Sequence, residues 1–346
     1  MVGPAVTVVA PDALADPDRP SGGNSYDRRV CHELAAAGWT VDLELIPGGW
    51  PQVDPESRLH LAAVLSALPP GRVALLDGLV ALTTPEVVVP ASSRLRVVVL
   101  VHMPLDDERE GAVLHAATAV LVTSQWTRRR LIARYGLDPA KVHVATPGVD
   151  PAPPARGTDD GGSLLCVGAV VPAKGHDLLM SALADVADLR WRCRWVGALS
   201  RDPQHVAGLR SRIRAEGLAD RIELAGALDG AAVAAAYATA DLLVHPSRAE
   251  TYGMVVTEAL ARGVPVLAAD VGGVPEALGG GGTGVSPGVL VPIDDSTALA
   301  ATLRAWLTDG FLRSWLRAGA CARRSQLAGW QDTGRRVGRV LEEAAA

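Results

Sequence analysis

The stretch at residues 241–276 reads DLLVHPSRAETYGMVVTEALARGVPVLAADVGGVPE. It opens with an apolar run long enough for one buried parallel strand, and a second such run follows at 264–268. Between them, apolar residues recur with helical periodicity from 252 to 262, and Gly263 suits a helix C-terminus. A strand, a helix and a second strand in this order predict a parallel α/β fold.

Two carboxylates in this stretch, Glu250 and Glu258, are separated by seven residues. Glu250 falls in a loop after a strand, at the sheet edge where open α/β sheets bind ligands. Glu258 falls inside the predicted helix, on the same face as Met254. The start of that helix suits a phosphate, and a carboxylate further along can accept two hydrogen bonds from a ribose diol. Solvated helix-end charges are the alternative, which the surrounding glycines and the spacing weaken.

Composition limits the class of protein. A length of 346 residues suggests two domains, and 49% apolar residues are enough for two cores built from Val, Leu and Ala. The net charge of −5 argues against a nucleic-acid partner, which would need a basic surface. The four cysteines are scattered without a CxxC pair, and no zinc site or HExxH pattern is visible.

The N-terminus leads directly into a strand-like run at residues 6–10 and lacks the features of a signal peptide. No apolar run approaches the ~20 residues of a membrane span. We therefore expect a cytoplasmic protein.

Strand-like and helix-like segments alternate along the chain, as in α/β proteins. In the first half we predict strands at 6–10, 41–46, 73–76, 95–101, 119–123 and 142–145, and helices at 25–37, 56–68 and 125–135. In the second half we predict strands at 164–167, 192–196, 222–225, 242–245, 264–268 and 289–291, and helices at 176–187, 203–216, 230–238, 253–262 and 296–308.

A proline-, glycine- and acid-rich stretch at 147–162 interrupts this alternation and indicates a linker. We expect one domain at 1–150, a linker at 151–162 and a second domain at 163–310. The tail at 311–346 is predicted to be mostly helical and to cross back to the first domain.

Each predicted domain has a glycine-marked turn after its first strand, at 20–24 (PSGGN) and at 167–175 (VGAVVPAKG). The adjacent Gly22 and Gly23 let backbone N–H groups approach an anion, and Lys174 places a positive charge beside a helix start. Ordinary loops and a solvated lysine are the alternatives. Together with Glu250 and Glu258, the turns predict a site for an anionic diphosphate.

Two further polar residues follow predicted strands. His102 ends the strand at 95–101, and on position alone a structural role is as plausible as a functional one. Ser124 opens the next helix, where we favour plain N-capping. No GxGxxG follows the first strand, and there is no GxxxxGK[ST] or GxSxG motif, so a dinucleotide fingerprint, a P-loop and a nucleophile elbow are all missing.

The chain resembles the retaining glycosyltransferases of family 4, which have the GT-B architecture of two facing Rossmann-like domains. The resemblance covers nearly the whole chain. The matching features, in order, are Gly22-Gly23, His102, TSQWTRRRLIARYG at 123–136, PGVD at 147–150, VGAVVPAKGHDLLMSAL at 167–183, the two glutamates, and GGVPE at 272–276.

The resemblance implies roles for individual residues. Lys174 should neutralise the leaving diphosphate, Glu250 should bind hydroxyls of the donor sugar, and His102 should bind that sugar near its anomeric centre. Glu258 should hold the ribose. The remaining nucleotide-sugar contacts are expected from Gly253, Met254, Val255, Gly22, Gly23 and Gly168.

The implied reaction moves a hexose from a UDP or GDP sugar to a hydroxyl of a small-molecule, glycan or lipid acceptor, with retention of configuration. The acceptor would bind the N-terminal domain and the nucleotide sugar the C-terminal domain. No cofactor is expected. No metal is expected either, because the acidic pair Asp106-Asp107 lacks a third partner.

One position departs from the family pattern, which usually has Arg where this chain has Ala169. Loss of one such electrostatic contact costs on the order of 10²–10³ in rate. Arg248 is one candidate for compensation.

Other functions stay open. A non-catalytic or weakly active nucleotide-sugar-binding homologue would explain Ala169, but it has less need of Lys174, Glu250 and Glu258. A nucleotide-sugar epimerase or a sugar phosphorylase fits the order of motifs poorly.

Peripheral membrane contact is a further possibility, because the predicted helix at 126–135 carries four arginines between apolar residues. A solvated helix face is the preferred interpretation in a chain that is acidic overall.

Overall fold

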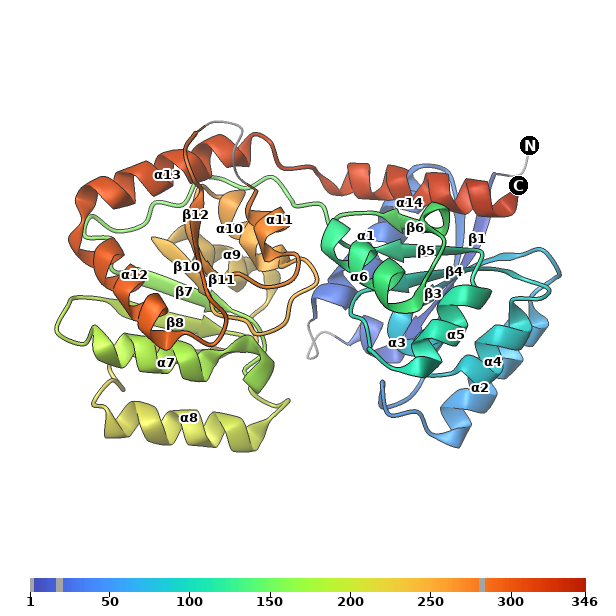
Figure 1. Cartoon of the computed structure of the whole chain (residues 1–346), viewed down its shortest axis with the longest axis horizontal. Helices are drawn as coiled ribbons and strands as arrows, with labels where there is room; N and C mark the ends of the chain where they lie inside the picture. The colour runs from blue at the N-terminus through green and yellow to red at the C-terminus, as the bar shows by residue number, and fades with distance from the viewer. Residues whose placement is uncertain (1–2, 17–20, 280–283) are drawn as a thin grey trace. The chain divides into compact units, whose positions relative to one another are not determined.

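The computed structural model describes residues 3–16, 21–279 and 284–346. The chain divides into two compact units. Unit 1 comprises residues 1–148 and 328–346, and unit 2 comprises residues 149–327. Each unit is an α/β structure around one parallel sheet (Figure 1).

The sheet of unit 1 has six parallel strands. They are β1 (Ala5–Pro11), β2 (Thr40–Ile46), β3 (Val73–Asp77), β4 (Arg96–Val101), β5 (Ala119–Val122) and β6 (Val142–Val144). Their order in the sheet is β2-β1-β3-β4-β5-β6. The predicted strands of this half are confirmed, with ends that differ by about a residue.

Helices cover both faces of this sheet. They are α1 (Gly22–Ala36), α2 (Pro55–Ala67), α3 (Gly78–Leu82), α4 (Pro85–Ala91), α5 (Glu108–Ala116), α6 (Gln125–Tyr135) and, from the end of the chain, α14 (Trp330–Ala345). The chain connects β1 to β2 through α1 in one direction along the sheet, and then connects β2 to β3 and on to β6 in the opposite direction. Because parallel crossovers are right-handed, α1 lies on one face of the sheet and the later connections lie on the other. The last helix, α14, packs beside α1 (Figure 1).

Three helices of unit 1 were not predicted, namely α3, α4 and α5. Two of them have only five and seven residues, and α4 contains Pro90, which interrupts helical periodicity. The helix α5 carries Gly111 in its middle, which lowers helix propensity.

The sheet of unit 2 also has six parallel strands. They are β7 (Ser163–Val167), β8 (Arg192–Val196), β9 (Ile222–Gly226), β10 (Leu242–His245), β11 (Val266–Ala269) and β12 (Gly288–Val291). Their order is β12-β11-β10-β7-β8-β9. The predicted strands are confirmed again, with ends that differ by a residue or two.

The helices of unit 2 are α7 (His176–Asp185), α8 (Pro203–Ala215), α9 (Gly230–Ala238), α10 (Met254–Leu260), α11 (Val274–Leu278), α12 (Ser296–Thr308) and α13 (Gly310–Arg324). α7 packs against α8 and α12, and α10 packs against α11 and α13. Pro275 lies in the first turn of α11, where a helix accommodates a proline.

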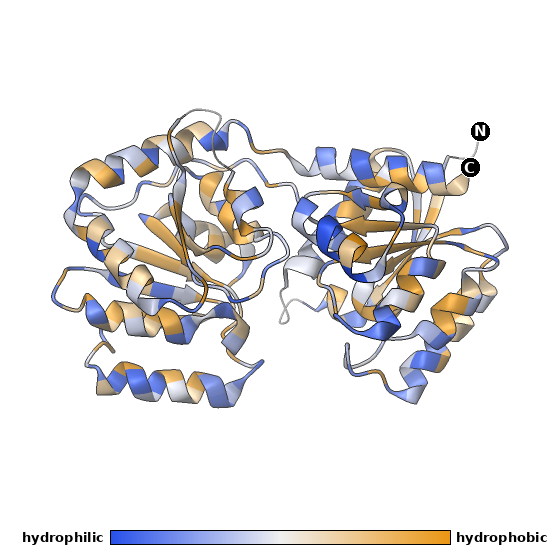
Figure 2. Cartoon of the chain, viewed as in Figure 1, coloured by the Kyte–Doolittle hydropathy of each residue, from blue (hydrophilic) through white to orange (hydrophobic). Residues whose placement is uncertain are grey.

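Each unit has its own apolar core. The strands of both sheets are strongly apolar, whereas the helices turn hydrophilic residues outward (Figure 2). Val, Leu and Ala dominate as expected, but unit 2 also buries Trp195 and Trp306 almost completely. Among the described helices, none is both long enough and apolar enough to cross a membrane.

The strand orders fix where a ligand crevice lies in each unit. In unit 1 the chain leaves β1 in one direction and β3 in the other, and in unit 2 the same reversal occurs between β7 and β10. Open α/β sheets bind ligands at such a switch point, beyond the carboxyl ends of the strands. Functional side chains are therefore expected in the loops that follow these four strands.

Candidate functional site

In unit 2, Lys174 and Glu250 meet at the switch point. Lys174 lies at the end of a short 3-10 turn (Pro172–Lys174) after β7, and Glu250 lies in the loop after β10. The Lys174 Nζ atom is 2.5 Å from Glu250 Oε1. His245, the last residue of β10, places Nε2 2.9 Å from the same oxygen, so one carboxylate oxygen faces two nitrogen groups.

Burial and charge act against each other on Glu250, whose side chain is only 11% exposed. Burial alone would raise the pKa of Glu250, but the Lys174 ammonium and His245 outweigh it and lower that pKa to about 2. Glu250 is therefore a permanent carboxylate at any physiological pH.

Two glycines of the GGVPE motif hold the Glu250 loop. A Cβ atom on Gly272 would lie 1.7 Å from the Glu250 carbonyl oxygen, and the φ of Gly272 is +55°. The Gly273 N–H donates to that same carbonyl at 3.1 Å. Only glycine fits at residue 272, so this motif acts on the site through the backbone beside Glu250.

Gly168, predicted to contact the nucleotide sugar, lies beside Lys174. A Cβ atom at this position would be 3.6 Å from Lys174 Cδ. The structure thus brings Gly168, Lys174 and Glu250 together in unit 2.

Glu258 lies on α10, whose first residues are Met254 and Val255. The N-cap residue is Gly253, so no side chain caps the start of this helix. Glu258 Oε2 accepts a hydrogen bond of 2.9 Å from the Tyr237 hydroxyl. Burial raises the pKa of Glu258, although Tyr237 and Arg262 oppose the shift.

Arg262 also stacks over Tyr237, with its guanidinium 4.8 Å from the ring centroid. Glu258 therefore belongs to a network with Tyr237 and Arg262, which differs from that of Glu250.

Arg248 is a candidate substitute for the arginine absent at Ala169, but its guanidinium already has acidic partners. Its Nη1 and Nη2 donate to Asp177 at 2.8 Å each, and its Nε donates to Asp294 at 2.6 Å. Two carboxylates thus occupy Arg248, and the structure contradicts a free guanidinium here.

In unit 1, His102 follows β4 and contacts two buried carboxylates. Its Nε2 lies 2.7 Å from Asp27 Oδ1 on α1 and 3.6 Å from Asp77 Oδ2 at the end of β3. Gly22 and Gly23 are the first residues of α1, and a Cβ atom on Gly23 would lie 3.2 Å from the His102 ring. Pro20, which opens the predicted turn, lies outside the described residues.

Asp27 and Asp77 determine the charge of His102. Burial by itself would lower the pKa of His102, but the charge and hydrogen bond of Asp27 and the charge of Asp77 raise it to about 9. Burial raises the pKa of Asp77, and the nearby Asp27 adds to this shift. One protonated imidazole therefore shares a buried space with two carboxyl groups.

The ligand atoms of Asp27, Asp77 and His102 lie within 4.8 Å of one another, as a metal site requires. Two ligands of a single tetrahedral ion, each ~2.1 Å from it, would be roughly 3.4 Å apart. The 2.7 Å between Asp27 and His102 is instead the length of a charged hydrogen bond. We therefore describe the group as an ion pair.

Sequence reasoning missed Asp27, Asp77 and His245 as site residues. Asp77 and His245 each end a strand, as His102 nearly does, and this position was the available signal. Asp27 gives no such signal, because it lies within a polar run of α1.

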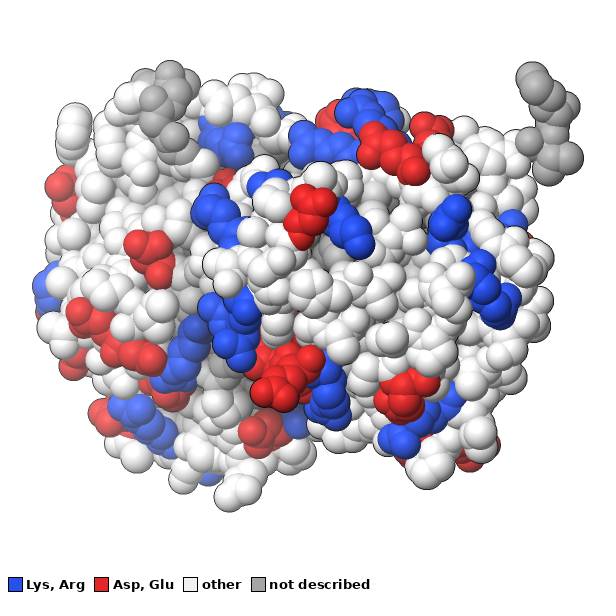
Figure 3. All heavy atoms as spheres, turned by 45° about the vertical axis from the view of Figure 1, so that its right-hand side comes forward, with Lys and Arg blue, Asp and Glu red and all other residues white. Residues whose placement is uncertain are grey.

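Ser124 N-caps α6 as predicted, accepting from the Thr127 N–H at 3.0 Å. Arginines of α6 have partners within unit 1. Arg130 pairs with Asp106 at 2.7 Å, and Arg128 donates to the carbonyls of Val142 and Pro139. On the face shown in Figure 3, acidic and basic side chains are interspersed. These contacts favour a solvated helix face for α6.

Two family models match the chain. The model described as "Glycosyltransferase Family 4" matches residues 20–153, and the one described as "Glycosyl transferases group 1" matches residues 161–309. The first match falls in unit 1 apart from its last residues, and the second falls in unit 2.

Curated relatives carry a common name. The D-inositol 3-phosphate glycosyltransferase of Kineococcus radiotolerans is 37% identical over 247 residues, covering 65% of this chain and 57% of the relative. The D-inositol 3-phosphate glycosyltransferase 1 of Catenulispora acidiphila is 35% identical over 256 residues, covering 68% and 59%. The chain thus spans less than two thirds of the length of these relatives.

Solved structures share the fold. Sucrose-phosphate synthase from Thermosynechococcus elongatus superposes with a TM-score of 0.79 at 21% identity, covering 99% of both chains. Anabaena Alr3699/HepE in complex with UDP and glucose superposes with a TM-score of 0.78 at 19% identity, covering 97% of this chain and 99% of that one. At these identities the likeness shows the fold, which is that of two Rossmann-like halves.

Proposed function

The chain belongs to glycosyltransferase family 4, and on this premise we propose that it transfers a hexose from a nucleoside diphosphate sugar to a hydroxyl group of a small acceptor. The observation that carries the proposal is the arrangement of Lys174, His245 and Glu250 at the switch point of unit 2.

This arrangement suits both parts of a nucleotide sugar. An ammonium group has three N–H donors, and the contact with Glu250 uses one, so Lys174 keeps donors for a diphosphate. Glu250 Oε1 faces Lys174 and His245, so its second oxygen can accept hydrogen bonds from sugar hydroxyls. A carboxylate whose pKa is lowered to about 2 keeps this acceptor character at neutral pH.

We assign Glu258 to the ribose of the same ligand. One of its oxygens accepts from Tyr237, and the other can accept from a ribose hydroxyl. Gly253, Met254 and Val255 begin the helix that carries Glu258, and Gly168 lies next to Lys174. The proposal keeps all four as contacts of the nucleotide sugar.

The proposed chemistry retains the anomeric configuration and needs no metal ion. The bond from the anomeric carbon to the diphosphate breaks, and a bond to the acceptor oxygen forms on the same face. The acceptor proton passes to the leaving phosphate oxygen. Lys174 stabilises the negative charge that develops on the diphosphate, which is the role that a metal ion has in other transferases.

The comparisons suggest which ligands to test first. The HepE protein was solved with UDP and glucose, and the curated relatives are named for D-inositol 3-phosphate. We therefore propose a UDP-linked hexose as the first donor and a cyclitol phosphate as the first acceptor. A GDP-linked hexose is the second donor to test.

A thermal-shift and hydrolysis screen against UDP-, GDP- and ADP-sugars, with EDTA present, tests this function. We expect one donor to raise the melting temperature, and addition of acceptor to give a product whose anomeric configuration, read by NMR, is that of the donor. Absence of any donor response would contradict the proposal. Activity that EDTA abolishes would contradict its metal-independent part.

A further inference from the structure

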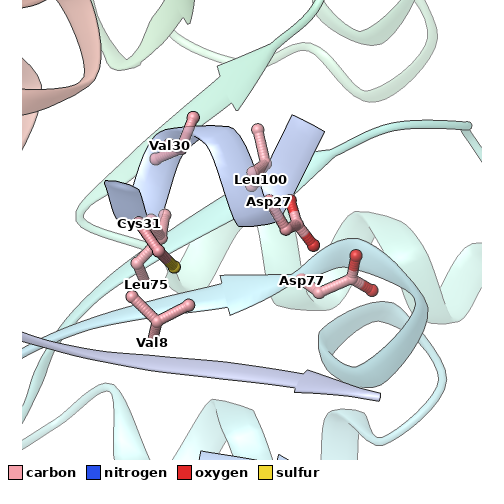
Figure 4. Close-up of a pocket in the computed structure, with 7 residues that line it drawn as sticks. All are labelled: Val8, Asp27, Val30, Cys31, Leu75, Asp77 and Leu100. Atoms are coloured by element: carbon pink, nitrogen blue, oxygen red, sulfur yellow. The ribbon is translucent and has the colours of Figure 1, made fainter. Parts of the chain in front are cut away.

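The buried cluster in unit 1 contains two carboxyl groups that the predicted site did not include. Asp27 and Asp77 project from α1 and from the end of β3, and their carboxyl groups point toward one another (Figure 4). Their exposed side-chain fractions are only 4% and 6%, and that of His102 is 16%. Charges this well buried are little screened by water.

The backbone fixes Asp77 in this cluster. Its Oδ1 accepts a hydrogen bond of 2.7 Å from the Leu79 N–H and so caps α3. That contact leaves Oδ2 to face His102.

The ring of His102 is held from other sides as well. Tyr26 meets it edge-on at 5.2 Å between centroids, and the Tyr26 hydroxyl donates to the Ala145 carbonyl at 2.8 Å. Trp330 of α14 packs edge-on against Tyr26 in turn, at 5.7 Å. The position of His102 is therefore determined by several elements of unit 1.

Beside the two carboxyl groups lies a small cavity of about 10 Å³, which is room for about one water molecule. Apolar side chains form most of its wall, and the Cys31 thiol is the other polarisable group there. Such walls make the charges of Asp27 and Asp77 act strongly on their neighbours.

The titratable groups that act on His102 or on its neighbours come from several elements of unit 1. They are Asp27, Tyr26 and Cys31 on α1, Asp77 on β3, and Arg336 on α14, which acts on Tyr26. The pKa of Cys31 is raised to about 12 and that of Tyr26 is raised further, so both stay neutral. The carboxyl groups therefore decide the charge of the imidazole.

We propose that Asp27 and Asp77 are positioning residues that hold His102 as an imidazolium, with Nε2 on the carboxyl groups and Nδ1–H as the donor for an oxygen of the nucleotide sugar. The contact between His102 and the donor rests on the proposed function. The ion pair itself rests on the geometry of unit 1 alone.

This charge state changes what His102 can do. A neutral imidazole that donates from Nε2 to Asp27 has Nδ1 as an acceptor, whereas an imidazolium donates from both nitrogens. An oxygen of a phosphate or a sugar hydroxyl accepts more strongly from a charged donor.

NMR titration of the histidine side chains, in the full chain without ligand, tests the ion pair. Signals of His102 are assigned with a His102→Gln variant. We expect His102 to stay protonated to about pH 9. Asp27→Asn should lower this midpoint by about two pH units, and Asp77→Asn should lower it less. Asp54→Asn is the matched control, because Asp54 also caps a helix of unit 1.

A His102 midpoint near 6.5 in the wild type would overturn the proposal, whatever the variants do. So would a midpoint that Asp27→Asn leaves unchanged. Asparagine keeps the helix cap at residue 77, and a thermal melt of each variant shows whether the fold is intact.

Titration of UDP-glucose into the protein between pH 6 and pH 10 tests the donor contact. We expect affinity to fall as pH rises through the His102 midpoint, and to fall at lower pH in Asp27→Asn. An unchanged affinity across that midpoint would overturn the positioning role. If no nucleotide sugar binds, the proposed function and the donor contact fail together, while the NMR midpoint still decides the ion pair.

Discussion

The clusters around His102 in unit 1 and around Glu250 in unit 2 contain the same kinds of group in opposite proportion. In unit 1 one imidazole faces two carboxyl groups, and in unit 2 one carboxylate faces an ammonium and an imidazole. In each cluster the single group of its kind, the His102 imidazole or the Glu250 carboxylate, is held in its charged form. The pKa of His102 is raised to about 9, and that of Glu250 is lowered to about 2.

The two clusters also have corresponding places in their sheets. Asp77 ends β3 and Glu250 follows β10, and each of these strands lies at the switch point of its own sheet. The fold therefore determines where polar groups gather, whereas the choice of side chains determines the sign of the charge that is fixed there.

Removal of the ammonium group should have the largest effect. We expect Lys174→Ala to lower turnover by about 10²–10³-fold, since it removes charge stabilisation of the leaving diphosphate. Steady-state kinetics with a responsive donor measure this. Lys141→Ala is the matched control, because the Lys141 ammonium contacts only main-chain carbonyls of unit 1 among the described residues. Equal losses in both variants would remove Lys174 from the reaction.

The opposite charge balance predicts opposite pH dependence of stability. The pKa of Glu250 falls from 4.5 to about 2 on folding, so its charge stabilises the protein above pH 4.5 and this stabilisation is lost as pH falls to about 2. The pKa of His102 rises from 6.5 to about 9, so its charge stabilises below pH 6.5 and this stabilisation is lost as pH rises through 9.

Each shift corresponds to about 3 kcal/mol in the free energy of unfolding. Urea unfolding of the wild type, Glu250→Gln and His102→Gln across pH measures both. The loss of unfolding free energy in Glu250→Gln, relative to the wild type, should become smaller as the pH falls. The corresponding loss in His102→Gln should become smaller as the pH rises. Losses of stability that change in the same direction with pH in both variants would contradict the opposite charge balance of the two clusters.

Substitution of Glu258, which lies outside the cluster around Glu250, should have a smaller effect on ligand binding. Glu258→Ala should lower nucleotide-sugar affinity by about 10- to 100-fold, which corresponds to one charged hydrogen bond. Calorimetry measures the affinity, and Glu223→Ala on the exposed edge of β9 is the control. An unchanged affinity in Glu258→Ala would count against the ribose assignment.

The smallest effect concerns Ala169, where family members usually have arginine. Because two carboxylates occupy Arg248, we expect that Arg248 does not replace the missing guanidinium. Ala169→Arg should then raise turnover by about 10-fold, a part of the full electrostatic contribution. A fall in turnover, with the melting temperature unchanged, would show that this chain uses a donor that excludes arginine there.

Sequence patterns predicted the strands and most long helices, because buried parallel strands have short apolar runs that periodicity detects. The patterns also placed Lys174 and Glu250 in one predicted site for a diphosphate. They did not predict the contact between them, because β10 lies beside β7 only after the chain has crossed back from β9.

Other parts of the site gave weaker signals. The sequence pattern indicated only that His245 ends an apolar strand, so its contact with Glu250 was not predicted. Asp27 lies in a helix rich in polar residues, where a buried carboxylate cannot be told from a solvated one. The burial of a polar group depends on the packing of other elements, here β3 and β4, and not on its own neighbours in sequence.

The most direct test of the central claim compares UDP with UDP-glucose as ligands of the wild type, Glu250→Gln and Lys174→Ala. If Glu250 binds the sugar and Lys174 the diphosphate, Glu250→Gln should weaken UDP-glucose binding and retain UDP binding. Lys174→Ala should weaken both. Equal affinities of all three proteins for UDP-glucose would contradict a donor site built on Lys174 and Glu250.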